Sequence, residues 1–285
     1  MAQSIPLPVW PGDAAVCVSL TFDVDAESAQ LRHGSDVLTK MTTMSAARYG
    51  PVRGIPRILE LLDSRSIPAT FYVPGDTALR HPAAVRSIAI AGHEIGHHGF
   101  LHLHDDQAEL AGQREEIDRG LGALIELTGS APRGYRSPGW ELTEDVFGLL
   151  VKSGFDWDSS CMGDDRPYLE ESGDASLLEL PVHWSLDDVP YYAWSRAAGG
   201  QMCDPDTLTA TWLAEFDSAV AERRHVTYTM HPEFVGRGYR VAELARMVDE
   251  MRSRAAVWFA SHGQVAELIR AGGPAGVELP ARQPP

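Results

Sequence analysis

Short apolar runs alternate with longer amphipathic stretches along most of the chain. The runs are rich in β-branched residues and bounded by turn-forming residues, which predicts strands over Ala15–Phe22, Ala69–Val73, Glu94–Gly96, Gly134–Arg136, Phe155–Ser159, Leu177–Leu180, Val226–Met230 and Val257–Phe259. Apolar residues at helical spacing predict helices over Val52–Ser64, Pro82–Ala91, Asp105–Leu127, Thr143–Ser153, Asp206–Arg223, Val241–Arg254 and Ser261–Ala271. The last of these begins with Ser261 and Gln264, the pattern of a capping box.

The regular alternation of strand and helix indicates parallel strands joined by crossover helices. Eight strands within 285 residues favour a barrel over an open sheet, in one domain that spans residues 1–285. The segment 161–200 interrupts the alternation and is rich in Asp, Gly, Tyr and Trp. We expect it to form an elaborate loop that covers the rim of the barrel.

Composition narrows the class of protein. The chain is 44% apolar and 22% charged, as soluble globular proteins are, and no apolar stretch is long enough to span a membrane. The first residues lack the basic start and apolar core of a secretory signal, and the three cysteines are widely spaced, which predicts a cytoplasmic protein. A formal net charge of −16 opposes binding to nucleic acid or to an anionic membrane.

Two carboxylates close the first predicted strand. Residues two apart on a strand point to the same side, so Asp23 and Asp25 project together while Phe22 and Val24 turn the other way. Acidic residues after a strand are also common as turn formers. The pair alone therefore leaves a structural role open.

Histidines gather in one short segment, because 5 of the 11 in the chain lie between His93 and His104. His98 and His102 are four residues apart, a spacing that places both rings on one side of a helical turn or an extended segment. One carboxylate and two imidazoles form a three-ligand set with open positions, as a catalytic divalent ion requires. The second carboxylate would then be free to act as a general base.

The segment His93-Glu-Ile-Gly-His also matches the H-E-x-x-H pattern of zinc proteases. That pattern requires a continuous helix, whereas three glycines crowd this stretch and it follows the apparent end of a helix at Gly92. We therefore predict a strand here. On a strand, His93 and His97 cannot share the side of His98 and His102.

Five motifs resemble, in the same order, those of the polysaccharide deacetylase or NodB-homology superfamily of metal-dependent amide hydrolases. The matching segments are Thr21-Phe-Asp-Val-Asp, Gly92-His-Glu-Ile-Gly-His-His-Gly-Phe-Leu-His, Arg136-Ser-Pro-Gly, Asp156-Trp-Asp-Ser-Ser and Met230-His-Pro. The resemblance implies a distorted (β/α) barrel with about seven parallel strands. It further implies that Asp23 is the base, that Asp25, His98 and His102 bind the metal, and that Arg136 pairs with the base.

The last two motifs concern the proton donor. The resemblance implies that His231 is the general acid toward the departing nitrogen. Asp158 is the predicted partner that orients this histidine, with Asp156 as the alternative and neither of them as the third possibility. Four tryptophans could wall a pocket or belong to the core: Trp140, Trp157, Trp184 and Trp194.

The residues from Asp23 to Ser28, Asp-Val-Asp-Ala-Glu-Ser, resemble an intracellular subgroup with cyclic imide hydrolases, allantoinase-like enzymes and a peptidoglycan-deacetylase-like protein. This implies a homotetramer that hydrolyses non-peptide C–N bonds of a small cyclic imide, ureide or amide. The implied cofactor is one divalent ion, with Zn²⁺ preferred and Mn²⁺, Co²⁺, Ni²⁺ or Fe²⁺ as alternatives. Two other functions stay open, N-deacetylation of amino sugars or their polymers and a catalytically silent carbohydrate-binding protein.

Overall fold

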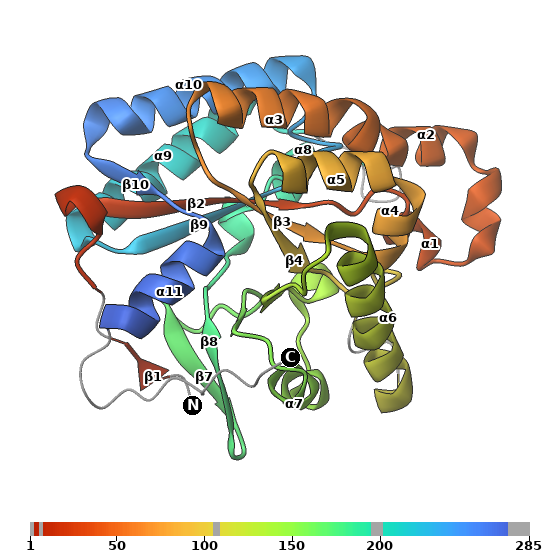
Figure 1. Cartoon of the computed structure of the whole chain (residues 1–285). Helices are drawn as coiled ribbons and strands as arrows, with labels where there is room; N and C mark the ends of the chain where they lie inside the picture. Colours follow the sequence, from red (N-terminus) through yellow and green to blue (C-terminus); the bar gives the residue numbers. More distant parts are fainter. Residues whose placement is uncertain (1–2, 6–7, 105–108, 195–201, 273–285) are drawn as a thin grey trace.

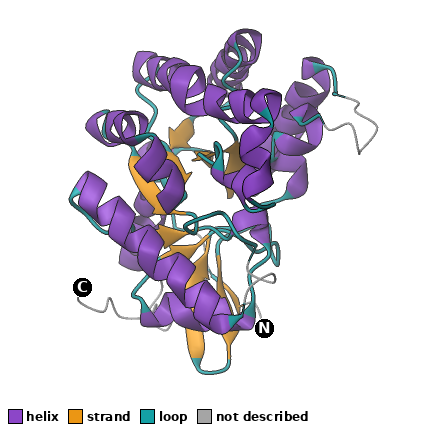
Figure 2. Cartoon of the chain, turned by 90° about the vertical axis from the view of Figure 1, so that its right-hand side faces the viewer, coloured by secondary structure: helices purple, strands orange, loops and turns teal. Residues whose placement is uncertain are grey.

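A curled sheet forms the centre of the molecule, and helices cover its outer face (Figures 1 and 2). The computed structural model describes residues 3–5, 8–104, 109–194 and 202–272. Its strands are β1 (Gln3–Ser4), β2 (Val16–Asp23), β3 (Thr70–Val73), β4 (Glu94–His97), β5 (Gly134–Tyr135), β6 (Trp157–Asp158), β7 (Tyr168–Ser172), β8 (Ala175–Glu179), β9 (His225–Met230) and β10 (Val257–Phe259).

The sheet confirms the predicted barrel of parallel strands. Strands β9, β2, β3, β4, β5, β6 and β8 follow one another in parallel around it. Strand β10 pairs in parallel with the first residues of β2, and β1 and β7 extend the other edge as antiparallel strands. All eight predicted strands are present, and the short strands β1 and β7 were not predicted.

The barrel closes incompletely between β8 and β9. Within the described residues, a single parallel bridge between Asp187 and Thr229 joins the chain beyond β8 to β9. The backbone N–H of Asp188 donates to the carbonyl of Thr229 at 3.1 Å. We call this junction between the chain after β8 and strand β9 the seam, and it is where the barrel departs from a regular closed one.

Helices of the crossover connections surround the sheet. They are α1 (Ser28–Leu31), α2 (Met41–Tyr49), α3 (Ile55–Ser64), α4 (Gly75–Arg80), α5 (Pro82–Ile90), α6 (Leu110–Thr128), α7 (Glu144–Lys152), α8 (Val189–Tyr192), α9 (Pro205–Glu222), α10 (Gly238–Arg254) and α11 (His262–Gly272). The short helices are η1 (Pro11–Asp13), η2 (Ser35–Thr39), η3 (Gly50–Gly54, a π-helix), η5 (Pro138–Trp140) and η6 (Trp184–Leu186). No described helix has both the length and the apolar content needed to cross a membrane.

All seven predicted helices are present, and their ends differ from the predicted ones by a few residues. The capping box is confirmed, because the N–H of Ser261 donates to Gln264 and the N–H of Gln264 donates to the Ser261 hydroxyl. The predicted start of one helix at Asp105 lies outside the described residues. Helices α1, α2, α4 and α8 were not predicted, since their apolar residues do not form a clear helical period.

Alternation along β2 separates an apolar exterior from a polar interior. Leu20 and Phe22 belong to the large apolar cluster shared with the outer helices. Ser19 and Thr21 are buried and form hydrogen bonds with His225 and Thr229 of the neighbouring strand β9. This polar interior leads up to Asp23 at the carboxyl end of the strand.

The prediction that residues 161–200 form a loop over the rim is wrong for the first half of that segment. Strands β7 and β8 form an antiparallel hairpin, and β8 is part of the barrel. Its turn at Gly173 precedes β8 and therefore lies at the end of the barrel opposite the rim (Figure 1). Residues from Trp184 to Val189 do reach the rim, and residues 195–201 lie outside the described part.

Candidate active site

Asp23, at the end of β2, is held by a fully buried arginine. Arg136 follows β5 and donates through Nη1 to Oδ1 of Asp23 at 2.7 Å and to Thr21 Oγ1 at 2.9 Å. Its Nε and Nη2 donate to the carbonyl and hydroxyl of Ser159, and its guanidinium lies 4.2 Å from the ring centroid of Tyr72. These contacts fix the guanidinium, which in turn orients the Asp23 carboxylate. The predicted pairing of Arg136 with Asp23 is confirmed in the geometry.

The structure also brings together the three predicted metal ligands. Oδ1 of Asp25 lies 3.4 Å from Nε2 of His98, and Oδ2 lies 3.3 Å from Nε2 of His102. One ligand atom from each of the three residues lies within 4.8 Å of the other two. His98 Nδ1 donates to the backbone carbonyl of Arg136 at 2.7 Å, which leaves Nε2 free to bind a metal.

These residues fit a divalent ion on chemical grounds. All three side chains are buried, and Oδ1 of Asp25 has no hydrogen-bond partner. Two imidazole nitrogens and a carboxylate suit Zn²⁺ and related ions, and three protein ligands leave positions for water or substrate. His102 adopts a left-handed backbone, with φ of 57°, which is uncommon outside glycine and is concentrated at functional sites.

His231 follows β9 and is oriented by an aspartate that the sequence analysis missed. Its Nδ1 lies 2.8 Å from Oδ1 of Asp188, whose carboxylate also accepts the backbone N–H of His231. Nε2 lies 3.7 Å from Oδ2 of Asp25 and therefore faces the candidate metal site. Burial alone would lower the pKa of His231, but Asp187, Asp188 and Asp25 outweigh it and hold this pKa well above its ordinary value.

The prediction that Asp158 orients His231 is wrong, and so is the alternative of Asp156. The Asp158 carboxylate accepts a hydrogen bond from Ser160 Oγ and lies next to the buried Glu179. Asp156 directly precedes β6, at the end of the barrel opposite the rim, and its carboxylate pairs with Arg133 at 2.6 Å. Strand β8 and the chain segment after it lie between β6 and β9, and the orienting carboxylate comes from this segment, beside β9.

Because the carboxyl group of Asp158 is buried beside Glu179, we expect the stability of the protein to depend on pH. Burial raises the pKa of Asp158 from 3.8 to about 6 and outweighs its hydrogen bonds with Glu179 and Ser160, which lower it, so ionisation of Asp158 disfavours folding as the pH rises through that window. Asp158→Asn should therefore raise Tm by about 2 °C at pH 7.5 and leave it nearly unchanged at about pH 3.5, below both pKa values. Asp156→Asn is the matched control and should lower Tm at pH 7.5, because it removes the partner of Arg133. A loss of stability at pH 7.5 in both variants would contradict the assignment.

A pocket of about 310 Å³ opens onto these groups. It is lined by the predicted residues Asp23, Asp25, His98, His102 and His231 and by others that include Arg32, Asp187, Glu233 and Phe234. Trp140 and Trp184 also line it, with ring centroids 4.4 Å apart. Trp157 is buried in a separate core cluster and Trp194 is 55% exposed, so two of the four tryptophans form the wall.

The zinc-protease interpretation is excluded by the backbone. Residues Glu94–His97 form strand β4 rather than a helix. The ring of His97 points away from the pocket, and its Nε2 bonds the carbonyl of Ile117 in α6. Glu94 accepts hydrogen bonds from Thr70 and from the N–H of Gly263, at the opposite end of the barrel from Asp25.

The chain belongs to the polysaccharide deacetylase family, whose model matches residues 13–157, just over half of the sequence. This stretch includes Asp23, Asp25, His98, His102 and Arg136. The protein is accordingly a hydrolase that acts on carbon–nitrogen bonds other than peptide bonds. The resemblance that the five motifs indicated is confirmed.

Individual relatives span nearly the whole chain. A peptidoglycan deacetylase of Helicobacter pylori is 27% identical over 281 residues, which cover 88% of this chain and 95% of that protein. The crystal structure of a candidate polysaccharide deacetylase from Mycobacterium smegmatis has a TM-score of 0.89 at 41% identity and covers 94% of this chain and 95% of that one. The crystal structure of the allantoinase Puue has a TM-score of 0.82 at 25% identity and covers 94% of both chains.

Proposed function

We propose that the protein is a metal-dependent hydrolase of a small cyclic imide, ureide or amide. The observation that carries this proposal is the convergence of three groups on one pocket. These are the Asp25, His98 and His102 set, the Asp23–Arg136 pair and the His231–Asp188 pair. Each supplies one requirement of amide hydrolysis: a metal site, a base and an acid.

The chain's own residues define the direction of proton transfer. A divalent ion held by the three ligands would supply Lewis acidity to water and to the substrate carbonyl. Oδ1 of Asp23 is held by Arg136, whereas Oδ2 lies 3.8 Å from His98 Nε2 and is placed to take a proton from the attacking water. His231 keeps its Nδ1 on Asp188 and presents Nε2 to the site, where it protonates the departing nitrogen.

The shape of the pocket supports a small substrate. Trp140, Trp184 and Phe234 provide an apolar wall. Arg32 and His33, which directly follow α1, line another part of the pocket. A volume of about 310 Å³ suits a single ring better than a sugar polymer, which needs an open groove. The likeness to an allantoinase over 94% of both chains supports a cyclic ureide in particular.

N-deacetylation of an amino sugar is the second candidate. It is favoured by the relative named peptidoglycan deacetylase, which this chain matches over 95% of its length. The same metal, base and acid would serve both reactions, so the substrate alone separates them. A catalytically silent binding protein would have no use for the Asp23–Arg136 and His231–Asp188 pairs.

A substrate panel tests the proposal. Purified protein, before and after chelation of metals, should be assayed on cyclic imides, ureides, N-acetylglucosamine and chitin oligomers. We expect hydrolysis of a cyclic imide or ureide, a loss of at least about 100-fold on chelation, and recovery with Zn²⁺ or another divalent ion. Activity confined to chitin oligomers, or activity that chelation leaves intact, would overturn the proposal.

The metal ligands can be tested without any substrate. His98→Gln should abolish stoichiometric Zn²⁺ binding in elemental analysis, because it removes one of the three ligands. His93→Gln is the matched control, since His93 lies outside the pocket, and should retain one Zn²⁺ per chain. Equal metal content in both variants would contradict the assigned ligand set.

A further inference from the structure

Arg32 is a cation in the active-site pocket that forms no ion pair with a carboxylate of the described residues. It directly follows α1 and lines the pocket together with His33 and the candidate metal ligand Asp25. Its Nε donates to His33 Nε2 at 3.2 Å, but its Nη1 is buried and has no hydrogen-bond partner. Burying a guanidinium nitrogen without an acceptor costs free energy. The described residues supply no acceptor for this atom, so a bound ligand could supply one.

Arg32 forms no ion pair within the described residues, although the chain is strongly acidic. The sequence has 40 acidic and 24 basic residues, yet no carboxylate of the described residues lies within ion-pair distance of Arg32. Burial lowers the pKa of Arg32, with the Asp25 charge opposing this, but an arginine keeps its proton at neutral pH.

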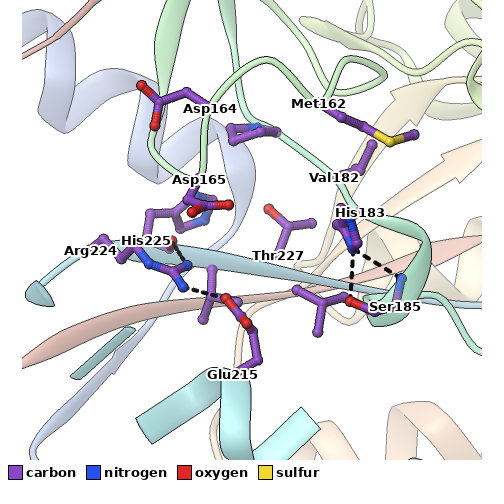
Figure 3. Close-up of a pocket in the computed structure, with 13 residues that line it drawn as sticks. Met162, Asp164, Asp165, Val182, His183, Ser185, Glu215, Arg224, His225 and Thr227 are labelled. Atoms are coloured by element: carbon purple, nitrogen blue, oxygen red, sulfur yellow. Dashed lines mark hydrogen bonds and ion pairs between the residues drawn. The ribbon is translucent and has the colours of Figure 1, made fainter. Parts of the chain in front are cut away.

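A second cavity provides the contrast. This cavity of about 140 Å³ lies between the segment after β8 and strand β9 (Figure 3). Its arginine, Arg224, donates to Glu215 and to Glu222, so the protein itself satisfies the cation there. The buried Arg136 is likewise paired with Asp23. Arg32 differs from both because none of the described residues accepts a hydrogen bond from its Nη1.

We propose that Arg32 binds a carboxylate of the substrate and so selects small cyclic amides, imides or ureides that carry an acidic group. This inference rests on the proposed function and specifies its substrate class. A carboxylate accepts the N–H groups of a guanidinium in charge-assisted hydrogen bonds, which are stronger than bonds to a neutral carbonyl. The ring of such a substrate would pack on the apolar wall formed by Trp140 and Trp184.

Two probes that differ by one carboxylate test the proposal. Dihydroorotate and dihydrouracil share a cyclic ureide ring, and only the former carries the acidic group. Their dissociation constants should be measured by calorimetry on the metal-loaded protein in a His231→Gln background, so that neither probe is consumed. We expect dihydroorotate to bind at least about 10-fold more tightly than dihydrouracil, the gain typical of a charge-assisted hydrogen bond.

Variants assign that preference to Arg32. Arg32→Gln should abolish it while changing the dissociation constant of dihydrouracil less than about twofold, and Arg32→Lys should retain part of it. Arg53→Gln, which removes the same charge from an exposed position of η3, is the matched control and should keep the full preference. A preference that survives in Arg32→Gln, equal binding of the two probes, or no binding of dihydroorotate would overturn the proposal.

These outcomes are separate from those of the proposed function. If Arg32 controls a carboxylate preference but no ureide or imide is hydrolysed, the proposed reaction fails and the binding role stands. If neutral cyclic substrates are hydrolysed with metal dependence and Arg32→Gln leaves their kcat/KM and the probe preference unchanged, the function stands and the role of Arg32 fails.

Discussion

Asp23→Asn is expected to lower kcat by about 10²–10⁴-fold, the range of a lost general base. Asparagine has nearly the same shape, but its amide cannot take a proton from water. The change also leaves Arg136 buried without its counter-charge, for which the expected cost in the free energy of unfolding is about 3–5 kcal/mol. Activity and thermal stability should therefore both fall, and both should be measured on the same preparation.

A second variant separates the two effects. Thr21→Val removes another acceptor of Arg136 Nη1 and leaves the Asp23 carboxylate in place. It should cost stability, with a loss of activity far smaller than that of Asp23→Asn at a temperature where both variants are folded. If Asp23→Asn retained normal kcat under those conditions, Asp23 would not be the base.

His231→Gln is expected to lower kcat by about 10²–10⁴-fold for substrates with a poor leaving group. The departing nitrogen of an alkyl amide must be protonated, whereas an acidic leaving group departs without help. The loss should therefore shrink when the leaving group is made more acidic, as in an anilide that carries nitro groups. A loss of the same size across a leaving-group series would contradict the role of acid.

Asp188→Asn refines this test through the pH profile. The pKa of His231 is held above its ordinary value in part by Asp188, and the proposed role of acid requires the protonated form. Removing the carboxylate charge lowers that pKa, so the alkaline limb of kcat should move to lower pH. Asp158→Asn is the control, because Asp158 does not contact His231, and its alkaline limb should stay in place.

The sequence was sufficient to predict the barrel and most of the site for physical reasons. Period-two alternation placed Asp23 and Asp25 on one side of a strand, and glycines in the histidine segment excluded a helix. Carboxyl ends of parallel strands meet at one rim, so residues from distant motifs could be expected to converge there. The five ordered motifs then distinguished the base from the metal ligand.

The parts that failed depend on long-range geometry. Asp188 lies in an irregular segment with no periodicity, and only the adjacent Asp187-Asp188 pair hinted at a buried acidic site. Strand β7, the hairpin partner of β8, was missed because only two of its five residues are buried. The homotetramer, the cytoplasmic location and the lack of nucleic-acid partners stay predictions.

The incomplete closure between β8 and β9 divides the site into two structural units. The candidate metal ligands and the proposed base lie at the ends of β2 and β4 or just beyond them, and Arg136 follows β5, all within continuously hydrogen-bonded sheet. His231, the proposed acid, follows β9, and Asp188 follows the bridge at Asp187. The two side chains therefore meet across the seam, where a single bridge joins the chain to β9. The ability to hold a metal and the ability to release the leaving group are therefore mechanically separable, and variation along the seam could alter turnover while the metal centre keeps its form.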